Sequence, residues 1–171
     1  LFRSRFFAPM MLEMTDRGPD SAGFAIYRDA VADGEIKMTL LASEGIEWDT
    51  VSASLNEGTE GKSRLDPVGN HAVLRSSVPQ AAIEGLLREQ FPQIEILSSG
   101  QAIEIFKEKG LPERAVERFG MNKLVGSHAL GHTRMATESA VTTAHSHPFS
   151  TGEDLCLVHN GSLSNHNRLR T

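Results

Sequence analysis

Apolar side chains recur every three to four positions in several parts of this chain, which is the spacing of a helix with one buried face. Three such segments predict helices, namely 5–15, 79–91 and 112–120. A proline near the first turn of the second segment and a glycine that closes the third agree with these boundaries. A last helix is predicted over 162–170, after a polar turn.

Short apolar runs between glycine, proline and polar residues predict strands elsewhere in the chain. The predicted strands are 22–27, 36–43, 71–77, 127–136 and 154–161. Residues 94–99 and 101–109 fit two more strands, or a strand and a short helix. Residues 44–70 are polar and rich in glycine, so we expect a long excursion without a regular element there.

Strands outnumber helices, and helices stand at both ends of the chain. This order favours an α+β domain in which sheets pack face to face and helices cover the outside. A length of 171 residues is enough for one sizeable core, so we predict a single domain over residues 1–171. Pattern alone does not choose among α+β folds.

Charge and composition exclude some classes of partner. The net charge of −5 and the pI near 5.8 argue against a nucleic-acid partner, which needs a basic face. The apolar runs are too short to span a membrane. The single cysteine, Cys156, excludes an internal disulfide and fits a reducing compartment, so we predict a cytoplasmic protein.

The segment GHTRMAT, residues 131–137, ends a predicted strand with Arg134. A guanidinium in a pocket offers a planar fork that bonds both oxygens of a carboxylate. The alternative is a surface ion pair. The small and polar residues around Arg134 favour the carboxylate site.

The segment HNG, residues 159–161, also follows a predicted strand. The side-chain amide of Asn160 and the backbone N–H of Gly161 could both donate to an oxyanion. The alternative is an ordinary Asn-Gly turn at a strand end. An apolar strand before the pair and a predicted helix after it favour the oxyanion site.

Two other features suggest chemistry that we consider weaker. His145 and His147 are two residues apart and would share a strand face, as metal ligands do, but no zinc-type spacing accompanies them. Cys156 could act as a nucleophile, but it stands in the apolar run LCLV, where buried thiols are usually inert. We predict neither a metal site nor a catalytic Cys156.

The order RGPDSAG, GHTRMAT, HPF and HNG along the chain resembles the class II glutamine amidotransferases. RGPDSAGFAIY and TESAVTT are closest to free-standing amidotransferase subunits similar to the N-terminal domain of glutamate synthase. The resemblance implies the four-layer αββα fold of N-terminal-nucleophile hydrolases, here incomplete at both ends. It implies glutamine as substrate, glutamate-synthase-like partner subunits, and no cofactor. It is weakest over 44–120, an insertion in which little is recognisable.

The resemblance also implies roles for individual residues. Arg134 would hold the α-carboxylate of glutamine with help from Thr137, and His147 of the HPF element would lie beside the glutamine pocket. Asn160 and Gly161 would form the oxyanion hole. The remaining role, proximity to the N-terminal Cys nucleophile, would belong to Arg17.

Two features of the family are not found in residues 1–171. The family opens with Cys-Gly-Ile, whereas this sequence begins with Leu1, and the later Asp that binds the substrate amino group has no counterpart. We therefore expect a partial domain that releases no ammonia by itself. The intact enzyme would release ammonia through a Cys thioester. The alternative is a non-catalytic glutamine-binding or scaffold subunit on the same fold.

Convergence on one small substrate makes a structural prediction. The carboxylate anchor and the oxyanion donors must approach the same molecule. We therefore expect two stacked, mainly antiparallel sheets, in which the strands that end at Arg134 and His159 are adjacent.

Overall fold

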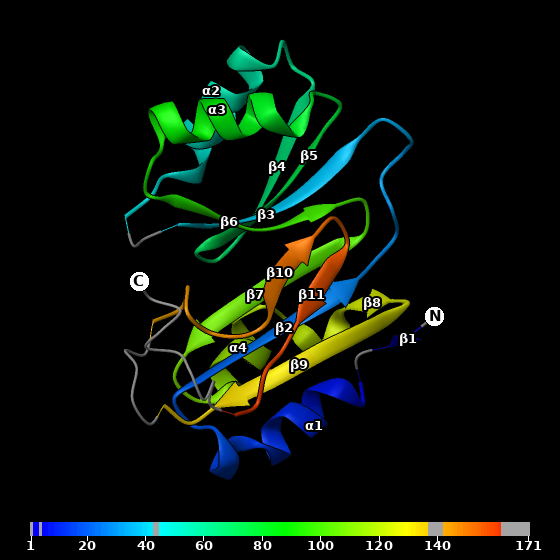
Figure 1. Ribbon diagram of the computed structural model, residues 1–171, viewed down its shortest axis with the longest axis vertical. Helices are drawn as coiled ribbons and strands as arrows, with labels where there is room; N and C mark the ends of the chain where they lie inside the picture. The colour runs from blue at the N-terminus through cyan, green and yellow to red at the C-terminus, as the bar shows by residue number, and fades with distance from the viewer. Residues whose placement is uncertain (1, 4, 43–44, 137–141, 162–171) are drawn as a thin grey trace.

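The computed structural model describes residues 2–3, 5–42, 45–136 and 142–161. It is a mixed α+β structure with several antiparallel sheets (Figure 1). The predicted helix over 162–170 and the site candidate Thr137 lie outside the described residues. None of the helices in the described ranges combines the length and the apolar composition of a membrane span.

The larger sheet has four antiparallel strands in the order β4-β5-β3-β6. Its strands are β3 (Ile36–Ala42), β4 (Ser63–Val68), β5 (His71–Ser76) and β6 (Ile94–Gly100). Two helices cover one face of this sheet, namely α2 (Trp48–Gly58) and α3 (Gln80–Gln90) (Figure 1). Val51 and Leu55 of α2 and Ile83 of α3 pack there against Met38 and Leu74. Burial of such side chains contributes about 1.5–3 kcal/mol each.

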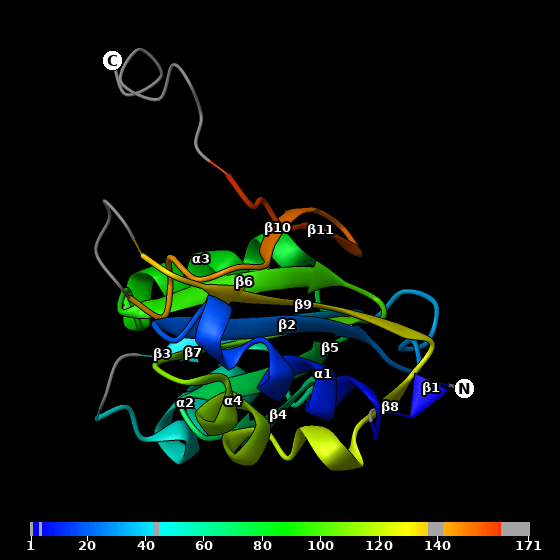
Figure 2. The same cartoon turned by 90° about the horizontal axis from the view of Figure 1, so that it is seen from below.

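The smaller sheet has three antiparallel strands in the order β7-β2-β9. Its strands are β2 (Ser21–Tyr27), β7 (Ile103–Lys109) and β9 (His128–Arg134). The helices α1 (Phe7–Glu13) and α4 (Pro112–Arg118) pack on one face, around Phe24 and Phe106. The hairpin of β10 (Phe149–Gly152) and β11 (Leu155–Leu157) covers the other face (Figure 2).

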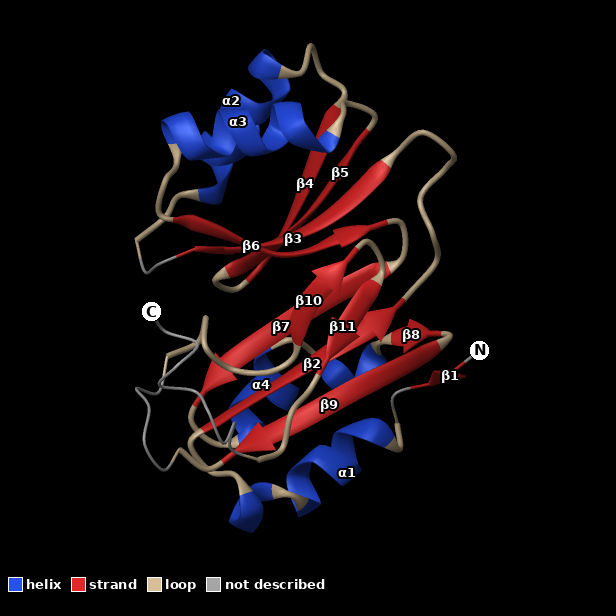
Figure 3. Cartoon of the chain, in the orientation of Figure 1, coloured by secondary structure: helices blue, strands red, loops and turns tan. Residues whose placement is uncertain are grey.

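Shorter elements complete the described chain. Strands β1 (Phe2–Arg3) and β8 (Val125–Gly126) pair with each other. The 3-10 turns η1 (Thr15–Arg17) and η2 (Met121–Lys123) follow α1 and α4. Figure 3 shows α2 and α3 at one outer side, α1 at the other, and α4 behind the smaller sheet.

Most of the predicted elements are confirmed. The ambiguous pair over 94–109 is two strands, β6 and β7. The prediction for 44–70 is wrong, because this stretch contains α2 and β4. The apolar spacing of Trp48, Val51 and Leu55 is helical, but polar residues surround it. Strand β10 was not predicted, since FSTG has no apolar alternation.

The two large sheets meet at β7, an edge strand of the smaller sheet. On an edge strand, every second N–H points away from the neighbouring strand. On β7 three of these groups point into the protein and meet a side chain. Ile103 N–H donates to Asp154 Oδ1 at 2.9 Å, Ile105 N–H to Thr39 Oγ1 at 3.2 Å, and Lys107 N–H to His71 Nε2 at 3.2 Å. The contact is therefore made by a strand edge against the face of β3 and β5.

A buried ion pair stands beside this contact. Lys37 Nζ of β3 lies 3.3 Å from a carboxylate oxygen of Glu104 on β7, and both side chains are almost fully buried. Arg28 and Arg75 approach the same carboxylate at 3.3 and 3.6 Å. Burial lowers the pKa of Lys37, while the charge of Glu104 opposes that shift. Breaking such a pair leaves an uncompensated buried charge, so the pair fixes β7 against β3.

His71 is fully buried, and its tautomer follows from its contacts. Because Nε2 accepts the N–H of Lys107, the proton of the neutral ring is on Nδ1, which donates to Asn70 Oδ1 at 2.9 Å. Burial above all, and then the charges of Arg118 and Lys107, lower the pKa of His71 to about 3. The folded protein thus holds this imidazole neutral.

The neutral His71 predicts a pH dependence of stability. Its pKa is about 3 in the folded chain and about 6.5 in the unfolded chain, so the unfolded chain takes up the proton first as the pH falls. Stability is fully present above about pH 6.5 and declines towards pH 3, by up to about 1.4 kcal/mol per pH unit from this group. Urea denaturation between pH 7 and pH 4.5 measures the slope. The variant His71→Gln keeps an acceptor and should give a shallower slope. If the free energy of unfolding fell equally steeply with pH in the two proteins, the neutral, buried state of His71 would be contradicted.

Candidate functional site

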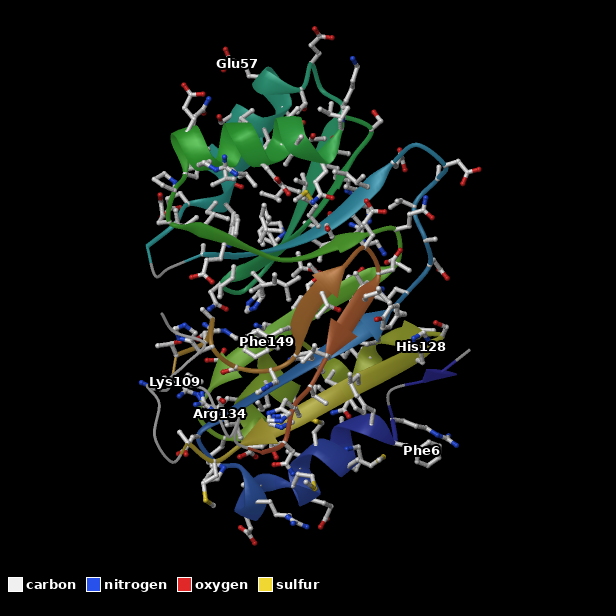
Figure 4. The ribbon with its side chains drawn as sticks, viewed as in Figure 1. Phe6, Glu57, Lys109, His128, Arg134 and Phe149 are labelled. Atoms are coloured by element: carbon white, nitrogen blue, oxygen red, sulfur yellow. The ribbon has the colours of Figure 1, made fainter. Side chains whose placement is uncertain are left out.

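The candidate site lies at the end of β9, on the face of the smaller sheet that the β10–β11 hairpin covers. In the antiparallel register, His132 lies opposite Gly23, and Gly23 lies opposite Lys107. The next row on this face is formed by Arg134, Ser21 and Lys109. Figure 4 shows Arg134 and Lys109 at the same end of the sheet. Because side chains alternate between the two faces of a strand, the histidine and the arginine of GHTRMAT, two residues apart, lie on one face.

The turn RGPD fixes the end of β9. The backbone N–H of Asp20 donates to the carbonyl of Arg134 at 3.1 Å, and the Asp20 carboxylate accepts the N–H of Ala136 at 2.7 Å. A Cβ on Gly18 would stand 2.5 Å from the backbone nitrogen of Arg134. Asp20 and Gly18 are thus structural. Arg17 is exposed at the end of η1, and its predicted role beside a nucleophile stays a prediction.

The segment 142–148 lies across the sheet above Gly23. A Cβ at Gly23 would stand 2.2 Å from the carbonyl oxygen of His147, so the close approach requires glycine. The His147 ring is half-buried and stands 4.5 Å from the ring of His132. The prediction that His145 and His147 share a strand face is wrong. Both precede β10, and His145 is exposed with its Nδ1 2.7 Å from Thr142 Oγ1.

Burial, together with the charges of this region, lowers the pKa of two imidazoles. Burial is the main cause that lowers the pKa of His147 to about 4, followed by the charges of His132, Arg134, Lys107 and His159. Burial, Arg134 and His159 also lower the pKa of His132. Within the described ranges, the Nδ1 atoms of His132 and His147 are buried without a hydrogen-bond partner. This face of the sheet combines the cations of Arg134 and Lys107 with neutral imidazoles. Such a combination suits a small polar anion.

The HNG segment follows β11 at the surface. Asn160 and Gly161 are both exposed, and Gly161 has a φ of +151°, which favours glycine. The prediction that the strands ending at Arg134 and His159 are adjacent is wrong, because the two strands do not pair. Strand β11 ends at Leu157 and pairs with β10, whereas β9 pairs with β2. His159 nevertheless lies near enough to His132 and His147 to lower the pKa of both.

Cys156 lies at the other end of the sheet. Its Sγ is 3.6 Å from the hydroxyl of Tyr27, and it packs against Ala25 and Leu97. Tyr27 and Gly23 are four residues apart on β2, which is about 13 Å along a strand. The half-buried thiol is therefore remote from the row of Gly23 and His132. Among the described residues, no group of three or more histidine, cysteine or acidic side chains could hold a metal ion.

Two residues of the site were not singled out from the sequence. His132 stands two positions before Arg134, so strand periodicity alone would have put it on the same face. Lys107 continues the alternation of Ile103 and Ile105, both fully buried, and its side chain is buried with theirs. That alternation was the available signal. The partner of Lys107 across β2 depends on strand register, which the sequence pattern does not give.

A pair of glycine variants tests the packing of the segment 142–148. Gly23→Ala should force that segment away from the sheet and destabilise the protein by roughly 1–3 kcal/mol, as other overpacked sites do. Gly85→Ala is the matched control, because a Cβ there meets nothing within 4 Å and alanine favours helix α3. It should stabilise the protein by about 0.5–1 kcal/mol. Thermal unfolding measures both. A Gly23→Ala protein as stable as the parent would exclude the close contact with His147.

Comparisons with known proteins show what this chain is similar to. No protein-family model matches the chain. The chain is 47% identical over 163 residues to the glutamine amidotransferase-like protein GlxB of Rhizobium meliloti, covering 94% of this chain and 54% of GlxB. It is 29% identical over 93 residues to a glutamine–fructose-6-phosphate aminotransferase (isomerizing) of Idiomarina loihiensis, covering 52% and 15%. A Pseudomonas putida protein of the same name is 29% identical over 104 residues, covering 58% and 17%.

The chain spans about half the length of GlxB, at 54%, and smaller parts of the two aminotransferases. The similarity to GlxB covers 94% of this chain. The chain is therefore similar to proteins named as a glutamine amidotransferase-like protein and as glutamine–fructose-6-phosphate aminotransferases.

Proposed function

We propose that the chain forms part of a class II glutamine amidotransferase domain with the N-terminal-nucleophile hydrolase fold. The domain releases ammonia from glutamine through a Cys thioester and passes it to an acceptor on a glutamate-synthase-like partner subunit. The observation that carries this proposal is the gathering of Arg134, His132 and His147 on one sheet face. The 47% identity to GlxB gives independent support.

Arg134 is proposed to bind the α-carboxylate of glutamine. Its backbone is fixed on both sides, by the register with Ser21 and by the hydrogen bond from Asp20. A guanidinium held in this way presents two parallel N–H donors to a carboxylate. We propose that Thr137 assists and that the neutral ring of His147 lines the pocket. Because the pKa of His147 is lowered to about 4, its ring is neutral near pH 7 and lines the pocket without adding a charge.

Asn160 and Gly161 are proposed to form the oxyanion hole. Attack on the glutamine side-chain carbonyl by a thiolate creates a tetrahedral oxyanion. Loss of ammonia leaves the thioester, which water then hydrolyses to glutamate. Donors at the oxyanion contribute to kcat more than to binding, because the charge develops in the transition state. In the family the thiol belongs to an N-terminal Cys whose own amine is the base, and Arg17 is proposed to lie beside it. Cys156 is not the proposed nucleophile, since it contacts Tyr27 at the far end of β2.

Steady-state glutaminase kinetics on the complete protein test these roles. Arg134→Lys keeps the charge but loses the bidentate fork, so KM for glutamine should rise by roughly 10- to 150-fold. Asn160→Ala should lower kcat by about 10²–10³ and leave KM nearly unchanged. Arg88→Lys, on the exposed end of α3, is the matched control and should change neither.

The outcomes separate the proposed enzyme from the alternative. Unchanged KM for Arg134→Lys together with unchanged kcat for Asn160→Ala would remove both assignments. A complete protein that binds glutamine but releases no ammonia would instead be a non-catalytic glutamine-binding or scaffold subunit.

A further inference from the structure

Lys107 is a buried lysine of the candidate site that the proposed mechanism leaves without a role. Its side chain is 2% exposed, and its Nζ donates to the carbonyl of Ala144 at 3.0 Å. The same Nζ stands 4.5 Å from the ring centroid of Phe149. Both contacts are made to the segment that carries His147. In the described part of the chain, no carboxylate lies within ion-pair distance of this ammonium.

Burying the ammonium of Lys107 costs free energy, so the contacts that replace its hydration are important. An ammonium taken out of water loses hydration that one carbonyl and one aromatic face restore only in part. The two contacts stand on either side of His147, at Ala144 and at Phe149. Between them, the His147 carbonyl lies over Gly23, which is the register partner of Lys107. One ammonium on β7 thus joins both ends of the segment to the sheet.

We infer that Lys107 is a positioning residue, whose ammonium holds residues 144–149 on the sheet and so keeps His147 beside His132 and Arg134. This role rests on the proposed function: by holding the segment in place, Lys107 keeps the glutamine pocket ordered. Lys107 does not touch glutamine in this account. It acts through the backbone of Ala144 and the ring of Phe149.

The charge of Lys107 makes the restraint sensitive to pH. Burial lowers the pKa of Lys107 to about 8, and the carboxylate of Glu95 on β6 opposes the shift. The other charged or titratable groups that interact with it are His71 of β5 and His147 of the segment itself, both neutral above pH 7. Above about pH 8 the amine loses its cation–π contact and its charge-assisted hydrogen bond. The segment should then be held less firmly.

The first test does not depend on catalysis. In the complete protein, NMR measures the pKa of His147 and the amide exchange of Ser146, whose N–H donates to the Thr143 carbonyl inside the segment. Lys107→Met should raise the pKa of His147, because a neighbouring cation is removed, and should speed Ser146 exchange at least about ten-fold. Lys123→Met is the control: Lys123 is exposed in η2, which packs on the opposite face of the sheet.

The second test uses glutamine. Lys107→Met should raise KM about ten-fold and leave kcat within about two-fold, since a looser pocket binds substrate less well before any chemistry. Lys107→Arg keeps the charge at high pH. In the parent protein, the KM for glutamine should rise between pH 7.5 and 9. The exchange rate of the Ser146 amide, corrected for base catalysis of exchange, should rise over the same range. In Lys107→Arg they should stay level.

Each outcome decides the inference. A folded Lys107→Met protein with parental Ser146 exchange and parental His147 pKa overturns it. If Lys107→Met does not fold, the pH series on the parent and Lys107→Arg decides, and the same rise in both proteins overturns it. If the NMR changes appear but the parent releases no ammonia, the positioning role stands and the proposed glutaminase fails.

Discussion

The buried edge of β7 is the constraint on which the rest of the structure depends. A strand edge inside a protein leaves N–H groups that cost about 1–3 kcal/mol each if they find no acceptor. Here Asp154, Thr39 and His71 supply the acceptors, from the β10–β11 hairpin, β3 and β5. One strand therefore fixes three separate parts of the chain. The larger sheet and the hairpin are held in place by the same row of hydrogen bonds.

The candidate site inherits its geometry from this strand. The N–H of Lys107 is bonded to His71, and its side chain holds the segment around His147. Across β2, the same register row contains Gly23 and His132. Arg134, the proposed carboxylate anchor, stands one row further along. A change in the register of β7 would thus displace Lys107 from both His71 and the segment that carries His147.

The sequence predicted local elements better than their arrangement. The helical spacing in α3 depends on neighbouring residues, and this helix forms where expected, whereas the sequence left open whether residues 101–109 form a strand or a short helix. Helix α2 was missed because few apolar residues mark it. The motif around Arg134 was recognised, and the structure puts His147 near it. The alternation through Ile103 and Ile105 could have marked Lys107 as buried, but its partners depend on strand register and on a backbone carbonyl at Ala144, which carry no side-chain signal.

Amide hydrogen exchange of β7, residue by residue, tests this account most directly. The N–H groups of Ile105 and Lys107 point to no neighbouring strand, yet they are buried and bonded to Thr39 and His71. The account predicts that they exchange only with global unfolding, as slowly as Phe106 between them. Exchange of Ile105 and Lys107 at the rates of an exposed strand edge, with Phe106 still protected, would contradict it.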